Sequence, residues 1–224
     1  MNEFEQIQSS WNHLQKAYKA DLPAVTAARA RKFLASCPDW GPAWKILGSA
    51  LIDLARHSEA EAALKQALAL CPPEKLWIPL AELGHLERAR GNYEAAAAWY
   101  RRAIDAVPNE AGPHIFLGGI LARSGRLKEA EAAHRAATKC TQGCRDEAWL
   151  NLGFVLRAQE RYQEAAECFN QALALDSKYL PARRALRDVR QLLRELAAPT
   201  NPTPPNRQKP PKRQHRCPNT AATT

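Results

Sequence analysis

The sequence AWLNLGFVLRAQERYQEAAECFNQALALDSKY, residues 148–179, carries two helical patterns in succession. In the first, apolar residues recur at i, i+3, i+4 and i+7, which is the spacing of a single helix face. The second follows a turn expected over 158–161 and has an apolar face of its own. Small residues interrupt both faces at Gly153, Ala165 and Ala172. Because small residues let two helix backbones approach closely, the pattern predicts a tightly packed helical hairpin.

The same pattern occurs three more times upstream, in register, so the chain contains internal repeats. A Gly, two Ala and one large residue recur at spacings of 36, 34 and 35 residues. The Gly column is Gly48, Gly84, Gly118 and Gly153, the Ala columns are Ala60, Ala96, Ala130, Ala165 and Ala67, Ala103, Ala137, Ala172, and the large column is Leu64, Tyr100, His134 and Phe169. Gly costs about 1 kcal/mol relative to Ala inside a helix. Its recurrence at one place therefore indicates that close helix contact is worth more than this cost.

The columns resemble the signature of the tetratricopeptide repeat (TPR), W-x2-L-G-x2-Y followed by A-x3-F, A and P. Trp44 and Trp149 stand at its first place, and Pro72 and Pro108 stand where the second helix must stop. Leu or Glu replaces the first Tyr of the signature in every copy. The resemblance implies an all-α, right-handed superhelical solenoid of antiparallel helix pairs. It covers 41–74, 77–110, 111–144 and 146–179, and 1–40 looks like a degenerate N-terminal hairpin with Trp11, Leu14 and Tyr18.

Two further segments follow the repeats. Over 180–198, Leu186, Val189, Leu193 and Leu196 form one apolar face, which predicts a helix that caps the open end of the stack. Residues 199–224 contain seven Pro and almost no bulky apolar side chains, so we expect them to be disordered. The net charge of +9 is concentrated in these segments, with +3 in 180–198 and +5 in 199–224.

This basic C-terminal end leaves several interpretations open. A solvated, solubilising tail is the simplest. Arg183–Arg216 could instead contact nucleic-acid phosphates or an anionic membrane surface, although no interleaved aromatic residues are present to stack bases. The stretch 202–207 also matches the P-x-x-P-x-R pattern of SH3 ligands.

The sequence contains no recognisable catalytic constellation. It lacks a nucleotide-binding glycine loop, a nucleophile elbow and an HExxH motif. His134 stands in the large packing column and is expected in the core. Cys140 and Cys144 form a C-x3-C pair without the second clear pair of a zinc site, so a metal or redox role for them stays open. We therefore expect a protein that is not an enzyme and needs no cofactor.

The composition is that of an ordinary globular protein, with 46% hydrophobic residues in 224. No charge-free run of eighteen apolar residues occurs, so no membrane span is expected. The start, MNEFEQIQSSW, is polar and acidic, unlike a secretory signal. These features favour a cytoplasmic protein with reduced thiols.

The resemblance also implies a binding surface, because first helices line the concave side of such solenoids and commonly hold a peptide or a helix there. The positions beside the packing face of each first helix are predicted to line this groove. In sequence order they are Lys45, Ser49, Ile52, Ala81, His85, Arg88, Ile115, Gly119, Ala122, Leu150, Asn151, Phe154 and Arg157. We expect an apolar floor from Ile115, Leu150 and Phe154, and positive flanks from the Lys, His and Arg residues.

The function expected from these patterns is that of a non-catalytic scaffold or adaptor that binds a partner peptide or helix in the groove. Members of the family that clamp a C-terminal carboxylate use Lys, Asn and Arg at places that here read Lys45/Ser49, Glu82 and Gly112/Phe116, so a co-chaperone role is disfavoured. The alternative is a nucleic-acid-associated protein that uses the basic C-terminal helix and tail. The partner and the oligomeric state are not specified by the sequence.

Overall fold

The computed structural model describes residues 3–198, and the tail expected to be disordered, 199–224, lies outside the described residues. The described part contains eleven α-helices and one 3-10 turn, and no β-strand. The helices are α1 (Glu3–Lys19), α2 (Pro23–Ser36), α3 (Gly41–Asp53), α4 (His57–Ala69), η1 (Pro73–Lys75), α5 (Trp77–Ala89), α6 (Tyr93–Ala106), α7 (Ala111–Arg123), α8 (Leu127–Lys139), α9 (Arg145–Ala158), α10 (Tyr162–Leu175) and α11 (Leu180–Ala197).

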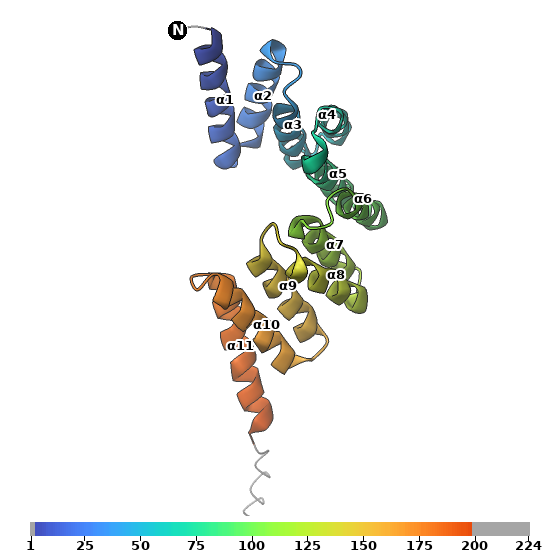
Figure 1. The fold of residues 1–224 in the computed structure, drawn as a ribbon, viewed down its shortest axis with the longest axis vertical. Coiled ribbons are helices and arrows are strands. Elements are labelled where there is room, and N and C mark those ends of the chain that lie inside the picture. Colours follow the sequence, from blue (N-terminus) through green and yellow to red (C-terminus); the bar gives the residue numbers. More distant parts are fainter. Residues whose placement is uncertain (1–2, 199–224) are drawn as a thin grey trace, which may run out of the picture.

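Consecutive helices pair as antiparallel hairpins, and the hairpins stack in one row that curves into an arc (Figure 1). Each first helix packs on its own second helix, and each second helix packs on the first helix of the next pair. First helices also contact one another, α3 with α5, α5 with α7 and α7 with α9. The second helices α4, α6 and α8 therefore follow the outer edge of the arc. The predicted all-α solenoid is confirmed.

The recurring glycines are the contact points inside the hairpins. A Cβ atom built on Gly48 would lie 2.5 Å from Leu64, one on Gly84 would lie 2.4 Å from Tyr100, and one on Gly153 would lie 2.4 Å from Phe169. Real Cβ atoms do not approach other atoms this closely, so no larger residue fits without displacing its neighbour. The large column thus fills the notch that the Gly column leaves on the facing helix.

The turn within each hairpin needs one residue in the left-handed region. Gly91 and Gly125 supply it in two hairpins, whereas Asp21, Ala55 and Glu160 adopt positive φ values of 51°, 56° and 61° in the others. A residue with a Cβ pays roughly 1–2 kcal/mol for this conformation. The packed helices on either side hold the turn in place despite this cost.

Ion pairs tie neighbouring hairpins together near the starts of their second helices. Arg126, just before α8, contacts Glu94 of α6 at 3.1 Å, and Arg161, just before α10, contacts Glu131 of α8 at 2.7 Å. Arg90 reaches Glu61 of α4 at 2.7 Å. Solvent screens ion pairs that are this exposed, so they adjust the stacking more than they drive it.

The N-terminal hairpin has no glycine notch and packs through aromatic rings instead. The ring of Trp11 lies 5.4 Å from that of Phe33 and 5.6 Å from that of Trp40, measured between centroids. Leu14 and Ala17 are fully buried beneath them. Although 1–40 departs from the repeat pattern, α1 and α2 therefore add a further pair to the row.

Helix α11 covers the open end of the last hairpin. Ala182, Ala185, Leu186 and Val189 are buried against α9 and α10. The predicted apolar face was wrong at its far end, because Leu196 is 64% exposed. The reason is length: α11 has 18 residues against 14 in α10, so its last turn has less of the hairpin to pack on.

Adjacent glycines in α7 provide a direct test of the notch. A Cβ on Gly118 would lie 2.5 Å from the ring of His134, whereas a Cβ on Gly119 would meet nothing within 4 Å. We expect Gly118→Ala to lower the free energy of unfolding by about 1–3 kcal/mol through overpacking. Gly119→Ala should raise it by up to about 1 kcal/mol through helix propensity. Urea denaturation followed by circular dichroism measures both, and equal effects of the two substitutions would refute the notch.

The buried His134 makes stability depend on pH. Burial lowers its pKa to about 4, and its Nδ1 has no hydrogen-bond partner in the described part of the chain. Between pH 6.5 and 4 the unfolded chain therefore binds more protons than the folded chain, so stability falls as the pH falls. This residue should account for ~2 kcal/mol of loss between pH 8 and pH 5.

Replacement of His134 by Phe, the residue that Phe169 supplies at the equivalent place, should remove that part of the pH dependence. Urea denaturation at pH 8 and pH 5 checks this. His57→Gln, at the start of α4, controls for removal of an imidazole elsewhere. Burial also lowers the pKa of His85 to about 4. The stability of His134→Phe should therefore still fall as the pH falls, but by less than that of the unchanged protein. An unchanged pH dependence would contradict the assignment.

Candidate protein-binding groove

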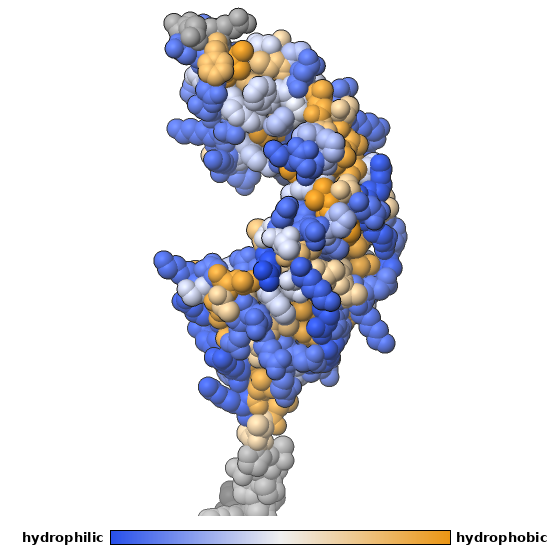
Figure 2. All heavy atoms as spheres, in the orientation of Figure 1, coloured by the Kyte–Doolittle hydropathy of each residue, from blue (hydrophilic) through white to orange (hydrophobic). Residues whose placement is uncertain are grey.

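The first helices form the inner side of the arc, and the space-filling view shows the surface hollowed there (Figure 2). We call this inner side the concave face. Two of the columns predicted to line it are partly or fully exposed at every position. They comprise Ser49, His85, Gly119 and Phe154, and Ile52, Arg88, Ala122 and Arg157.

In the third predicted column only the first member, Lys45, is half-exposed. Ala81 is 2% exposed, and Ile115 and Leu150 are 5% exposed each, so the predicted apolar floor was wrong at these positions. Leu150 packs in the cluster that α11 completes, and Ile115 packs in the cluster that includes Ala148 of α9. A first helix touches its own second helix and helices of the neighbouring pairs. A position next to the packing face of a first helix is therefore still buried between helices.

The position one residue further along replaces this column at the surface. Glu82, Phe116 and the predicted Asn151 are half-exposed there. The prediction of the groove omitted Glu82 and Phe116. The signal that could have found them is geometric, since they follow the buried Ala81 and Ile115 by about 100° around the helix.

At the N-terminal end of the concave face, Lys45 joins three first helices. Its Nζ lies 2.9 Å from the Tyr18 hydroxyl of α1 and 3.2 Å from the Glu82 carboxylate of α5. Burial alone would lower the pKa of Lys45, but the Glu82 carboxylate and the Tyr18 hydroxyl outweigh it and raise that pKa. Burial also raises the pKa of Glu82 despite the ammonium beside it. Lys45 is thus a neutralised structural cation.

Aromatic rings occupy the middle of the concave face. The Nδ1 of His85 lies 2.8 Å from the Tyr100 hydroxyl, and the His85 ring stacks edge-on against Phe116 of the next pair, 4.6 Å between centroids. Burial lowers the pKa of His85 to about 4, so its ring is neutral at pH 7. The predicted positive flank therefore loses His85 and keeps Arg88, which is exposed.

At the C-terminal end, Phe154 and Arg157 sit on the concave face. The Phe154 ring packs on Phe169, 5.4 Å between centroids, and the Arg157 guanidinium lies 5.2 Å above Phe154. Arg157 also pairs with Asp188 of α11 at 3.0 Å. Its charge is therefore already partnered, while its stem and the half-exposed Phe154 present an apolar surface.

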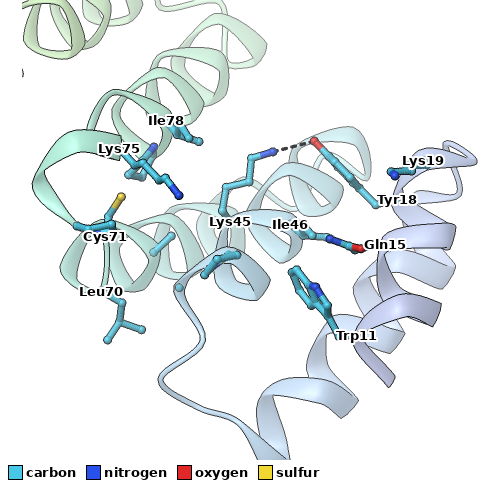
Figure 3. Close-up of a pocket in the computed structure, with 15 residues that line it drawn as sticks. Trp11, Gln15, Tyr18, Lys19, Lys45, Ile46, Leu70, Cys71, Lys75 and Ile78 are labelled. Carbon is cyan, nitrogen blue, oxygen red and sulfur yellow. Dashed lines mark hydrogen bonds between the residues drawn. The ribbon is translucent and has the colours of Figure 1, made fainter. Parts of the chain in front are cut away.

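A cavity of about 400 Å³ opens at the N-terminal end of the concave face. Figure 3 shows its walls: Trp11, Gln15 and Tyr18 from α1 on one side, Lys45 and Ile46 of α3 in the middle, and Cys71, Lys75 and Ile78 from the α4–α5 connection and α5 on the other. No cavity was predicted here from the sequence, because its walls come from three separate hairpins.

The cysteines do not converge on a metal-binding cluster within the described residues. Cys140 is buried with its Sγ near the Pro108 and Ala136 carbonyls, whereas Cys144 is exposed. The loop between them is held by a short bridge, in which the Ala111 N–H donates to the Gln142 carbonyl at 3.1 Å. This loop thus has a structural explanation as an inter-repeat connection.

Within residues 3–198, no helix combines the length and the apolar character needed to cross a bilayer.

Curated relatives share part of this chain. It is 35% identical to human tetratricopeptide repeat protein 7A over 94 residues, 42% of this chain and 11% of that protein. It is 30% identical to human tetratricopeptide repeat protein 7B over 134 residues, 60% of this chain and 16% of that protein. Human protein O-mannosyl-transferase TMTC1 is 30% identical over 132 residues, 59% of this chain and 14% of that protein. The chain spans less than a fifth of the length of each relative.

Solved structures with the same fold have low sequence identity. Yeast Tom70 matches with a TM-score of 0.69 at 16% identity, over 77% of this chain and 37% of that one. TTC0263 of Thermus thermophilus, a thermophilic TPR protein, matches with a TM-score of 0.62 at 20% identity, over 83% and 99%. YrrB, described as a TPR protein with an unusual peptide-binding site, gives 0.52 at 19% identity, over 78% and 88%.

Models of the tetratricopeptide repeat match three segments of the chain, residues 42–74, 81–143 and 146–179. Each segment contains helices of the stacked hairpins, and the Gly and Ala columns run through all three. Because the matched segments together make up more than half of its length, the chain belongs to the tetratricopeptide repeat family.

Proposed function

We propose that this protein is a non-catalytic interaction adaptor whose concave face holds a peptide or a helix of a partner protein. The observation that carries the proposal is the openness of this face at its centre. We place Gly119 there, between the aromatic pair of His85 and Phe116 and the C-terminal Phe154, and a Cβ atom added to it would meet no atom within 4 Å. Apolar anchors beside open space are what a docked segment requires.

The relatives support an interaction role in general terms. Proteins of this family are typically scaffolds, and the YrrB structure is described by its peptide-binding site. The match to an O-mannosyl-transferase covers 14% of that protein, and we do not propose transferase activity for this chain. We place the proposed adaptor in the cytoplasm, where its thiols would stay reduced.

A bulky residue at Gly119 should block the groove without disturbing the fold. We expect Gly119→Trp to reduce partner capture at least tenfold, because the indole fills the open centre of the concave face. Gly119→Ala, and Ala132→Trp on the exposed outer side of α8, should leave capture unchanged. Capture is measured by crosslinking the full chain to its partners and quantifying them by mass spectrometry. Equal recovery with Gly119→Trp and Ala132→Trp would reject the groove.

A second candidate function rests on α11. All five of its arginines are exposed; Arg183 and Arg190 donate only to neutral oxygens, and Arg184, Arg187 and Arg194 have no ion-pair partner within the described residues. This face could contact nucleic-acid phosphates, as the alternative prediction holds. We expect Arg184→Ala with Arg187→Ala to flatten the salt dependence of binding to a 20-base-pair DNA by about 1.8 in logarithmic slope. Binding that does not change with salt would exclude this role.

A further inference from the structure

We propose that the cavity at the N-terminal end of the concave face is an anchor pocket for one large apolar side chain of a partner segment, and that this side chain is flanked by acidic residues. The inference rests on the proposed adaptor function and assigns the chemistry of the segment that would be bound. The cavity lies between α1, α3 and the α4–α5 connection (Figure 3).

The walls of the pocket are apolar and remain partly open to solvent. Trp11, Ile78 and Leu70 are half-exposed or exposed around it, and Ile46 closes its base. The volume of about 400 Å³ lies within the usual range of ligand sites, about 300–1,000 Å³. Leaving such surface in water is costly, so a partner side chain that covers it would gain hydrophobic free energy.

The charges at the rim of the pocket favour particular residues on either side of the partner's apolar anchor. Among the residues described, three Lys and no Asp or Glu line the pocket. Glu82 neutralises Lys45, but Lys19 and Lys75 are exposed and have no ion-pair partner within 3–198. Two uncompensated ammonium groups beside an apolar hole favour a ligand with carboxylates on either side of its anchor.

The same charges argue against the chain's own tail as the occupant. Residues 199–224 carry five Lys or Arg and no acid, so the rim would repel them. Only part of the pocket belongs to the repeat pattern shared by the family. The first matched repeat begins at residue 42, whereas one wall of the pocket comes from α1.

The structure provides a reporter inside the pocket. The Cys71 thiol is half-exposed and lines the wall opposite α1, while Cys144 is exposed between α8 and α9, outside the pocket. A segment seated in the pocket should slow alkylation of Cys71 and leave Cys144 unaffected. Peptide mass spectrometry separates the two sites in one sample of the full chain.

The probes are twelve-residue synthetic peptides with a central Leu flanked by Asp and Glu, together with one control in which Ser replaces Leu and one in which Lys replaces the acids. Fluorescence anisotropy should show at least tenfold tighter binding of the acidic Leu peptide. That peptide alone should protect Cys71 from iodoacetamide. Binding that ignores the central residue or the flanking charge, or that leaves Cys71 unprotected, would overturn the proposal.

Two matched variants locate the binding. Leu70→Glu places a carboxylate at the pocket, and Leu175→Glu makes the same change at the repeat-equivalent end of α10; the two leucines are 37% and 49% exposed, so both variants should fold. Lys19→Glu with Lys75→Glu reverses the rim charge, and Lys128→Glu with Lys139→Glu makes the same change in net charge on α8. Only the pocket variants should weaken binding of the acidic Leu peptide at least tenfold. Equal losses in the control variants would refute the anchor pocket.

The two proposals fail in different ways. If Gly119→Trp abolishes partner capture while Leu70→Glu does not affect it, the groove is used and the anchor pocket is refuted. If Leu70→Glu abolishes binding of the acidic Leu peptide while Gly119→Trp has no effect on partner capture, the pocket holds and the concave-groove proposal fails.

Discussion

The contact between a glycine on each first helix and a large side chain on its second helix is the constraint on which the other features depend. In the four hairpins that contain it, a Cβ in place of the glycine hydrogen would lie 2.4–2.5 Å from Leu64, Tyr100, His134 or Phe169. The close approach buries the alanines on both sides of the notch and gives each hairpin nearly the same shape. Similar units stacked with similar offsets produce a regular curve. The concave face therefore follows from a packing contact that is buried inside each hairpin.

The curve determines which side chains remain available for binding. First helices pack closely on the inner side, so Ala81, Ile115 and Leu150 are buried between helices. What stays at the surface differs along the groove: a neutralised lysine at one end, neutral aromatic rings in the middle, and Phe154 under a paired arginine at the other. Lys45 and Arg157 are thus compensated within the fold, whereas Arg88 is exposed. Apolar contact would then supply most of the affinity for a partner, and the unpaired lysines at the N-terminal pocket would supply selectivity.

The N-terminal hairpin agrees poorly with the repeat pattern, but it forms one wall of the cavity. Without a glycine notch, α1 and α2 are held by Trp11, Phe33 and Trp40, and this packing leaves α1 positioned to form one wall of the cavity. Tyr18 of the same helix contacts Lys45 and so joins the hairpin to the repeats. Divergence from the repeat pattern thus coincides with an apolar cavity between the first hairpin and the repeats.

The helices, their pairing and the notch could be predicted from the repeat pattern, because the Gly, Ala and large columns encode contacts within a hairpin at fixed spacing. The positions Ser49, His85, Gly119, Phe154, Ile52, Arg88, Ala122 and Arg157 are exposed or half-exposed, and their part in a groove stays a prediction. The burial of Ile115 and Leu150, the half-exposure of Phe116 and Glu82, and the cavity between three hairpins became known only from the packed structure. These features depend on the rotation of each hairpin relative to its neighbours. Side chains that are distant in the chain determine this rotation by the way they pack. The spacing of residues in the sequence does not reveal how they pack.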